Sequence, residues 1–504
     1  MDTQNVVLVA DTLSRCVTKT ARTTAFVVAI AVAMASGSHL TAADLAVATA
    51  SLSLERAEAW APLPDAAPIV ARSDDGRVTL RGNGTRLCCG GWQYVFSGVR
   101  GGKGYRFEVE VRHSGLDSPR DSLAVIVLWD RWKPTSYRSG KRLWNYAFPT
   151  FPSENTTRFS CVVPAPPNAT HVTVRYVFRW STSGSSHWTA PRITPASIPR
   201  RSATKICVVA ETRQTADRIP IRPLSAGKKL PADVARSVDL WGSLILKACE
   251  ERPQLVVTPE LVIAGQDFVK GAIRVPGPAT EPFQKIARDH ATHLVLGVRE
   301  RDGDAIRNSA VLIGPDGQVQ GVYRKVHLAC SEQLSGLLPG DSFPVFDTQI
   351  GRIGCLICMD TTLSESARML ALGGADIICF PIMGDLRADR WSAGPPIFDE
   401  GRWRAIMRTR AIDNQVCMVV ARNGVKGSCI INRKGDILAW NEGDREVITA
   451  TLPAEDGYRV WNGGDFREIT FMLRRPQLYR IYSDPNNFGP LSPRGKPPQG
   501  YPVR

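Results

Sequence analysis

Residues 351–381 read GRIGCLICMDTTLSESARMLALGGADIICFP, and this stretch decides the fold of its part of the chain. An apolar strand is predicted over residues 352–357, and Cys358 stands at its end. A helix is predicted over about residues 363–372, where two glycines favour a helix C-terminus. The apolar ADIICFP then predicts the next strand. A strand, a helix and a strand in this order indicate an α/β fold.

The position of Cys358 suits a nucleophile. A thiol at the carboxyl end of a buried strand, just before a helix, faces a cleft. Backbone N–H groups at such a place can activate a thiol and receive an oxyanion. A buried cysteine that only packs in the core is equally compatible with this pattern, so the position alone does not decide between the two roles.

Two other apolar strands end in a charged residue. LVVTPEL places Glu260 just after a predicted strand, and YRKVHL places Lys325 after another. Taken singly, such residues are more often solvated or paired than catalytic. Strand and helix patterns alternate from about residue 205 to 450, and within them the three residues occur in the order Glu, Lys, Cys. This order raises the hypothesis that they meet at one site.

The order and its surroundings resemble the nitrilase superfamily of carbon–nitrogen hydrolases. The likeness covers about half of the chain. It implies an α-β-β-α sandwich over residues 203–455, a Glu-Lys-Cys triad, and a homodimer or larger oligomer. The matching stretches are TPEL at 258–261, YRKVHL at 323–328, PGD at 339–341, GRIGCLICMD at 351–360 and KGSCIINRKGDILA at 426–439.

In the chemistry that the resemblance implies, Glu260 takes the proton of the Cys358 thiol and later activates water. The sulfur attacks an amide or carbamoyl carbon and forms a thioester, while Lys325 and the backbone N–H of Met359 stabilise the oxyanion. Glu332 is the candidate for a second glutamate that family members often carry before the PGD segment. The expected reaction is hydrolysis of a small linear amide or N-carbamoyl compound, which releases ammonia or an amine.

The sequence departs from the family pattern near the nucleophile. Met359 stands where an aromatic residue is usual, and Asp360 resembles the amidase and carbamoylase branches more than nitrilases. We therefore expect a distinct substrate pocket, with Asp360, Pro381 and Met383 as candidate lining residues. Two alternatives stay open, namely a nitrilase that acts on nitriles and a catalytically silent nitrilase-like protein whose N-terminal part binds a glycan or a partner.

Cys355 and Cys358 form a C-x-x-C pair, so a redox or zinc site has to be weighed. A zinc site needs a second pair or clustered histidines, and neither lies nearby. A thioredoxin-like motif places both cysteines at a helix start, whereas Cys355 lies inside a predicted strand. His290 and His293 lack acidic partners, and there is no phosphate-binding loop or dinucleotide fingerprint. We therefore expect no metal and no cofactor. The pairing of the twelve scattered cysteines is left open.

Residues 66–195 contain short alternating runs, such as YRFEVEVRHS and HVTVRYVFRW, separated by Gly, Pro, Ser and Asn. This alternation, without a long helical pattern, predicts an all-β sandwich, which resembles the jelly-roll accessory domains of secreted hydrolases. Its aromatic residues are typical of a core, but exposed ones could stack on a glycan. They are Trp92, Tyr94, Trp129, Trp132, Tyr137, Trp144, Trp180 and Trp188.

The segments outside these two parts have distinct compositions. Within residues 1–43, the apolar AFVVAIAVAMA follows basic residues and precedes small ones, which predicts a secretory signal or an N-terminal anchor and therefore export. Residues 44–65 and the proline-rich 191–201 are predicted linkers, and residues 456–504 are predicted to form a C-terminal extended arm.

The net charge of +15 is spread along the 504 residues. No basic run is present, so we expect no nucleic-acid partner.

Overall fold

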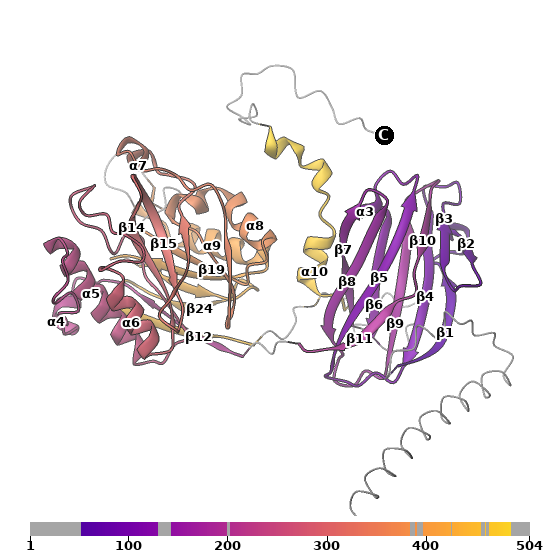
Figure 1. Ribbon diagram of the computed structural model, residues 1–504, viewed down its shortest axis with the longest axis horizontal. Helices are drawn as coiled ribbons and strands as arrows, with labels where there is room; N and C mark the ends of the chain where they lie inside the picture. Colours follow the sequence, from indigo (N-terminus) through magenta and orange to yellow (C-terminus); the bar gives the residue numbers. More distant parts are fainter. Residues whose placement is uncertain are drawn as a thin grey trace, which may run out of the picture. The chain divides into compact units, whose positions relative to one another are not determined.

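The computed structural model describes residues 52–129, 143–198, 202–383, 389–390, 397–424, 426–454, 459 and 463–484. Two compact units make up this part of the chain: one holds the residues up to 198 together with 459–484, and the other runs from 202 to 454 (Figure 1). The predicted signal segment 1–43 lies outside the described residues. Among the described helices, none is long and apolar enough to span a membrane.

Antiparallel strands build the first unit. Their order is β1-β4-β9-β6-β7-β8-β5-β10-β3-β2, and β11 pairs with β5 as well. The strand β7 pairs with β6 through its first half and with β8 through its second half. The strands are β1 Ser53–Trp60, β2 Ile69–Arg72, β3 Val78–Arg81, β4 Cys89–Ser97, β5 Gly104–Ser114, β6 Leu123–Trp129, β7 Trp144–Ser153, β8 Thr156–Pro164, β9 His171–Arg179, β10 Ser185–Trp188 and β11 Arg192–Ala196, with a single helical turn α3 at Pro119–Ser122.

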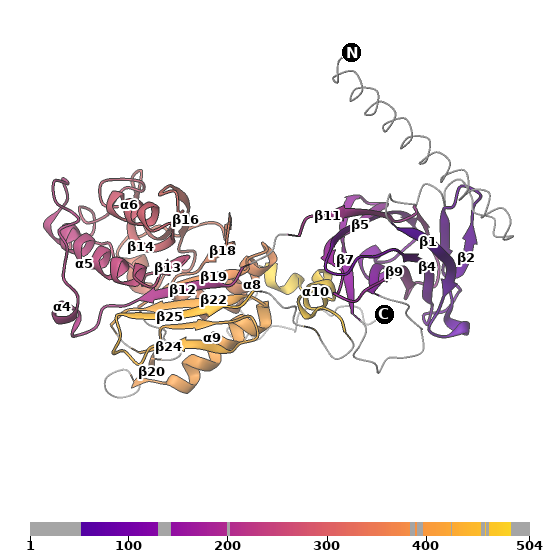
Figure 2. The ribbon, with the colours of Figure 1, turned by 90° about the horizontal axis from the view of Figure 1, so that it is seen from below.

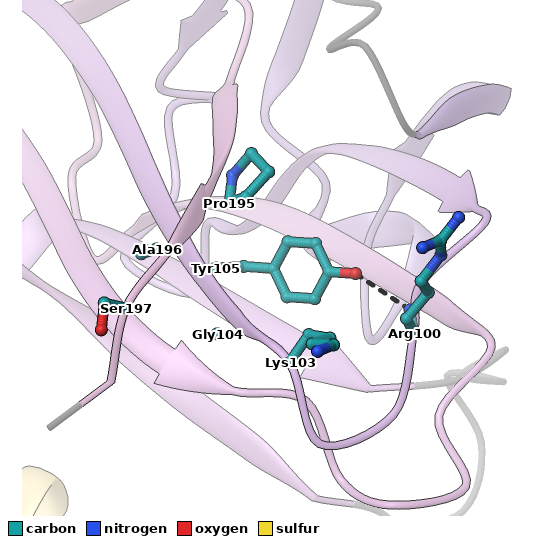
Figure 3. A pocket seen from close by; sticks show the side chains of 7 residues that line it. All are labelled: Arg100, Lys103, Gly104, Tyr105, Pro195, Ala196 and Ser197. Carbon is teal, nitrogen blue, oxygen red and sulfur yellow. Dashed lines mark hydrogen bonds between the residues drawn. The ribbon is translucent and has the colours of Figure 1, made fainter. Parts of the chain in front are cut away.

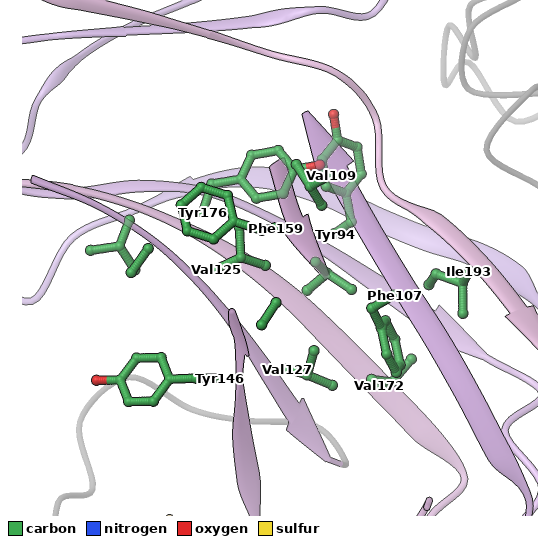
Figure 4. Close-up of a cluster of buried hydrophobic side chains, with 14 of the residues drawn as sticks. Tyr94, Phe107, Val109, Val125, Val127, Tyr146, Phe159, Val172, Tyr176 and Ile193 are labelled. Carbon is green, nitrogen blue, oxygen red and sulfur yellow. The ribbon is translucent and has the colours of Figure 1, made fainter. Parts of the chain in front are cut away.

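One apolar core fills this unit. Tyr94 and Tyr176 come from one half of the strand order, and Phe107 and Phe159 come from the other half (Figure 4). Along β5 the buried residues alternate with exposed or half-buried ones, because successive side chains of a strand point to opposite faces. The period-two pattern of the sequence is therefore the physical origin of the all-β architecture.

Three segments that we expected to be irregular contain regular structure. The strand β1 lies in the predicted linker 44–65, β11 lies in the predicted linker 191–201, and helix α10 (Phe466–Met472) lies in the predicted arm 456–504. β1 is an edge strand that buries few of its side chains, so its hydrophobic alternation in the sequence is weak. Pro195 fits in β11 because this strand pairs along one side only.

Helix α10 is held on the first unit through Glu468. The carboxylate accepts hydrogen bonds of 2.7 Å from Nδ2 of Asn145 and from the backbone N of Tyr146, both in β7. Two short turns follow the helix, η3 (Pro476–Leu478) and η4 (Arg480–Ser483). These two hydrogen bonds thus attach the C-terminal segment to strand β7 of the first unit.

The second unit contains two six-stranded sheets, ordered β16-β15-β14-β13-β12-β25 and β17-β18-β19-β22-β23-β24. The strands of the first sheet are β12 Thr204–Val209, β13 Leu255–Val257, β14 His293–Asp302, β15 Ala305–Ile313, β16 Val319–Arg324 and β25 Val447–Leu452. Those of the second are β17 Val345–Thr348, β18 Gly351–Cys355, β19 Ile377–Ile382, β22 Cys417–Arg422, β23 Cys429–Ile431 and β24 Ile437–Trp440, and a separate ribbon is formed by β20 Asp389–Arg390 and β21 Ile397–Phe398.

Helices cover the outer faces of both sheets. The helices are α4 Thr215–Arg218, α5 Ala232–Cys249, α6 Glu281–Asp289, α7 Cys330–Leu334, η2 Cys358–Thr362, α8 Ser364–Leu372 and α9 Glu400–Asn414. One core joins α5 and α6 to the first sheet, and a second core lies between the two sheets. Figure 2 shows α5 and α6 on one side of the sheets and α9 on the other. The predicted α-β-β-α sandwich is confirmed for this unit.

Candidate active site

Strand alternation places several polar side chains between the two sheets. On β15, Ala310 and Leu312 face the core between the sheets, and Asn308 shares their face because it lies two residues before Ala310. On β16, Tyr323 faces the same core, and Lys325 follows it by two residues. The backbone N of Lys325 donates to the carbonyl of Asn308 at 2.9 Å, which extends the ladder between the two strands to the site.

Lys325 lies between two carboxylates. Its Nζ is 2.8 Å from Oε1 of Glu260 and 2.7 Å from Oε2 of Glu332. Lys325 is 1% exposed and Glu260 is 5% exposed, so water screens these charges poorly. Burial alone would lower the pKa of Lys325, but the charges of Glu260, Cys358 and Glu332 raise that pKa above its ordinary value. Lys325 therefore stays cationic, and it suits stabilisation of negative charge better than proton abstraction.

Glu260 stands on a loop that follows β13 and packs closely against β14. Its Oε2 accepts a hydrogen bond of 3.0 Å from the backbone N of Met383. Thr258 Oγ1 accepts one of 3.0 Å from the N of Gly297. A Cβ at Gly297 would come within 2.2 Å of the carbonyl O of Pro259 and 3.0 Å of the Cα of Glu260. Only a glycine on β14 lets this loop approach so closely.

Glu332 and the backbone of Lys325 are held by neighbouring loops. Oε2 of Glu332 accepts a hydrogen bond of 2.7 Å from the N of Ala329, at the start of α7. The N of Gly340, in the PGD segment, donates to the carbonyl of Lys325 at 2.8 Å. The matched stretches of sequence thus meet around Lys325, although about 80 residues separate Glu260 from Gly340.

Cys358 begins the 3-10 helix η2, three residues after the end of β18. Its φ is +43°, a left-handed conformation that costs a residue with a side chain about 1–3 kcal/mol and recurs at functional sites. Cys358 is partly buried and packs against the core between the sheets. The N–H of Met359 lies in the first turn of η2, where backbone donors have no acceptor within the helix. It can therefore serve an oxyanion.

Asp360 bridges two elements of the site instead of lining a pocket, which corrects our expectation. Its Oδ2 accepts hydrogen bonds from the hydroxyl of Tyr323 at 2.6 Å and the N of Ile357 at 2.8 Å. Its Oδ1 accepts from the N of His327 at 3.0 Å and lies 2.9 Å from Nδ1 of the same residue. The side chain is fully buried. Asp360 therefore ties the Lys325 strand to the Cys358 loop.

The other two expected lining residues, Pro381 and Met383, differ in how far they are exposed to solvent. Pro381 is buried within β19, so it contributes packing. Met383 is 53% exposed and meets Glu260 through its backbone N–H. Our sequence reasoning missed Asn308, whose Nδ2 donates to both Glu260 and Glu332. The period-two alternation with Ala310 was the signal that could have found it.

The two cysteines of the C-x-x-C pair, Cys355 and Cys358, lie in different environments. Cys355 is fully buried in the core beside Cys379, whereas Cys358 is partly exposed beyond the strand end. None of the cysteines in the described ranges forms a disulfide. Within those ranges no group of three or more His, Cys, Asp or Glu side chains is arranged to hold a metal ion.

Most of the aromatic residues considered for glycan stacking do not face solvent. Tyr94, Trp129 and Trp188 are buried in the core of the first unit, and Trp92 and Trp144 are half-buried. Trp180 is 56% exposed, and the guanidinium of Arg179 lies 4.1 Å from its ring centroid. The remaining two, Trp132 and Tyr137, lie outside the described residues.

A cavity of about 380 Å³ lies in the first unit. The hydroxyl of Tyr105 in its wall accepts a hydrogen bond of 2.9 Å from the N of Arg100 (Figure 3). The wall holds no thiol and no carboxylate, so it lacks two of the three side-chain types of a Glu-Lys-Cys triad. Its lining residues are Arg100, Lys103, Gly104, Tyr105, Pro195, Ala196 and Ser197.

Comparison with known proteins gives consistent matches for the second unit. A family model described as carbon-nitrogen hydrolase matches residues 221–460. A probable nitrilase of Schizosaccharomyces pombe is 30% identical over 243 residues, which are 44% of this chain and 85% of that protein. Human omega-amidase NIT2 is 29% identical over 227 residues, which are 41% of this chain and 78% of that protein.

Two further matches are more partial. A nitrilase of Pyrococcus abyssi is 42% identical over 146 residues, which are 27% of this chain and 55% of that protein. Among solved structures, an amidase from Nesterenkonia sp. aligns with a TM-score of 0.43 and 22% identity, covering 57% of this chain and 99% of that one.

The family model falls on the unit that holds Glu260, Lys325 and Cys358, and the Schizosaccharomyces pombe relative is matched over 85% of its length. The chain belongs to the carbon-nitrogen hydrolase family of the nitrilase superfamily.

Proposed function

We propose that this protein hydrolyses a non-peptide C–N bond of a small linear amide or N-carbamoyl compound, through a thioester on Cys358. The observation that carries the proposal is the buried placement of Lys325 between Glu260 and Glu332, with Cys358 close enough to raise the pKa of Lys325. An acid, a cation and a sulfur grouped in this way supply the parts of an acyl-transfer site.

In the first half-reaction, a carboxylate oxygen of Glu260 takes the proton of the Cys358 thiol. The sulfur attacks the substrate carbonyl carbon, and the electrons of the C=O bond move to oxygen. Lys325 Nζ and the N–H of Met359 stabilise this oxyanion. The oxyanion then collapses, the C–N bond breaks, and the protonated Glu260 returns the proton to the leaving amine or ammonia.

In the second half-reaction, water attacks the thioester carbon while Glu260 accepts one of its protons. The same donors stabilise the second oxyanion. Collapse breaks the C–S bond and releases the carboxylic or carbamic acid, and the proton on Glu260 returns to the sulfur. Glu332 keeps Lys325 oriented throughout, through the 2.7 Å contact with its Nζ.

Nitrile hydrolysis is the second candidate activity. It is favoured by the names of two relatives, the nitrilase of Pyrococcus abyssi and the probable nitrilase of Schizosaccharomyces pombe. A nitrile carbon would accept the same sulfur, and the Lys325 cation would face the developing charge on nitrogen. The amide proposal is supported instead by the omega-amidase relatives.

Two measurements test the proposal on the full chain. Thiols are labelled with limiting iodoacetamide and located by mass spectrometry, and ammonia is measured with panels of linear amides, N-carbamoyl compounds and nitriles. We expect one fast-reacting thiol, which is lost in Cys358→Ala. We expect Lys325→Met to lower turnover by at least about 100- to 1,000-fold, the loss typical for one oxyanion donor.

Lys247→Met is the matched control, because Lys247 is half-exposed on α5 and pairs with Glu250 at the surface. It should keep full turnover. Uniform slow labelling of all thiols together with no ammonia release would contradict the proposal. Nitrile turnover far above amide turnover would replace the amide by the nitrile as substrate.

A further inference from the structure

Asn308 is part of the charged cluster formed by Glu260, Lys325 and Glu332. It lies on β15, is 1% exposed, and faces the core between the sheets. Its Nδ2 donates to Oε1 of Glu260 at 2.8 Å and to Oε1 of Glu332 at 2.6 Å. One neutral amide group therefore spans the same two carboxylates that Lys325 contacts, and it shares Oε1 of Glu260 with the Lys325 ammonium.

The orientation of this amide follows from chemistry. If the side chain were turned over, Oδ1 of Asn308 would face two carboxylate oxygens and repel both. With Nδ2 toward them, both of its hydrogens are used, and Oδ1 has no hydrogen-bond partner among the described residues. A buried amide that leaves its own acceptor unsatisfied indicates that the double donation outweighs that loss.

The charges around Glu260 explain why a double donor is needed. Glu260 and Glu332 share one ammonium, that of Lys325, so the group carries one more negative than positive charge. Like charges held together in a dry site repel each other strongly. Asn308 offsets that repulsion with two N–H dipoles and adds no second cation, which would compete with Lys325 for the carboxylates.

Other charged side chains near these strands pair among themselves. Glu300 binds Arg324 at 2.9 Å, and Asp302 binds Arg307 at 2.9 Å. Alternation puts these residues on the other face of the sheet from Asn308. On β14, Arg299 lies opposite Asn308, but its guanidinium donates to the carbonyl of Gly265 at 2.8 Å. Lys325 contacts both Glu260 and Glu332, and the charges of Glu260, Cys358 and Glu332 act on Lys325.

We infer that Asn308 is a positioning residue of this site, which holds Glu260 ionised and aligned as a base and keeps Glu332 on Lys325. The inference rests on the proposed function, because it assigns Glu260 the role of base. A hydrogen bond to a carboxylate favours the ionised form. Loss of the amide should therefore weaken the support for the carboxylate form of Glu260 and should hinder proton transfer from Cys358.

The test follows the pH dependence of two rates in the full chain, kcat/KM for the best substrate and alkylation of Cys358 by iodoacetamide. The second rate needs no substrate. In Asn308→Ala we expect the acid limb of both profiles to move to higher pH, and kcat to fall about 10- to 100-fold with a smaller change in KM. Asn308→Ser keeps one O–H donor, so its acid limb should lie between those of Asn308→Ala and the parent chain.

Asn145→Ala is the matched control. Asn145 also donates its Nδ2 to a buried glutamate, Glu468, but in the first unit, and its replacement should leave both profiles unchanged. If Cys358 reacts fast in the parent chain and the acid limb stays in place in both Asn308 variants, Asn308 has only a structural role and the inference is wrong. If Cys358 reacts no faster than the other thiols in the parent chain, the proposed function itself fails.

Discussion

The hydroxyl of Tyr323 donates a 2.6 Å hydrogen bond to Oδ2 of Asp360, and both groups are buried between the two sheets. Burial first, and then the neighbouring negative charge of Asp360, raise the pKa of Tyr323 well above its ordinary value. The phenol therefore stays protonated at neutral pH and donates to Asp360. Because the same carboxylate holds Ile357 and His327, this one side chain controls the approach of the Lys325 strand to the Cys358 loop.

Replacement of Asp360 should consequently damage both stability and turnover. Asp360→Asn keeps the shape but offers one acceptor oxygen to donors that now use two, and its NH2 group faces other donors. We expect a loss of about 1.5–3 kcal/mol in the free energy of unfolding and a large drop in kcat, measured by urea unfolding and ammonia release. Tyr323→Phe removes a single donor and should cost about 1 kcal/mol. A variant Asp360→Asn with parental stability would disprove the bridging role.

Gly297→Ala tests the close approach of β14 to the loop that carries Glu260. The added Cβ would meet the carbonyl of Pro259 at 2.2 Å, so the loop has to shift. A displacement of about 1 Å costs about 100-fold in rate, and we expect a kcat loss of that size. The control Gly401→Ala, in helix α9, meets only Oδ1 of Asp399 at 3.6 Å and should keep full turnover. Equal activity of both variants would contradict the assignment.

Cys355→Ala separates the two members of the C-x-x-C pair. Cys355 packs in the core beside Cys379, so its truncation should cost about 1 kcal/mol of stability and leave the fast-reacting thiol in place. Cys358→Ala should have the reverse effect, with loss of the fast thiol and little loss of stability. Thermal unfolding and iodoacetamide labelling of the two variants provide the readout. Loss of fast labelling in Cys355→Ala would revive the redox interpretation.

Glu468 should make the attachment of α10 sensitive to pH. Burial raises the pKa of Glu468 from 4.5 to about 7, and hydrogen bonds from Asn145 and Tyr146 oppose that rise. The folded state therefore binds a proton more tightly than the unfolded state. This stabilising contribution is complete below about pH 4.5 and is lost as the pH rises through about 7, an effect of about 3 kcal/mol.

Hydrogen exchange of residues 463–473 checks this prediction. Protection should fall between pH 5 and 8 in the parent chain relative to Glu468→Gln, which cannot ionise. Comparison of the two chains at each pH removes the intrinsic pH dependence of exchange. A pH-independent ratio of protection would show that Glu468 titrates in the ordinary range or does not hold the helix.

The sequence predicts the second unit better than the details of its site. Glu260, Lys325 and Cys358 each follow an apolar strand, and this signal is local and strong. Asn308 and Asp360 depend on which face of a strand or turn looks inward, and that is settled only by the register of β15 and by the left-handed turn at Cys358. Asp360 was expected in a pocket because the sequence departs from the family pattern beside the nucleophile, whereas in the structure three neighbouring residues use both of its oxygens.

In the first unit, prediction from the sequence fails for a different reason. The strands β5 and β9 alternate clearly, so the all-β pattern was predictable. The edge strand β1 was not, because an edge buries little and leaves little pattern. Helix α10 escaped notice for a related reason: it packs on the core through Met472 and Ile469 and is otherwise held by the buried Glu468, so its apolar pattern in the sequence is short.

The left-handed backbone of Cys358 has a consequence for how this sequence can change. A residue without a side chain would relax that turn, so drift toward thermostability pulls the position toward glycine. The proposed chemistry needs a sulfur at this position and therefore opposes a change to glycine. At this turn, selection for the proposed activity and selection for stability therefore favour different residues.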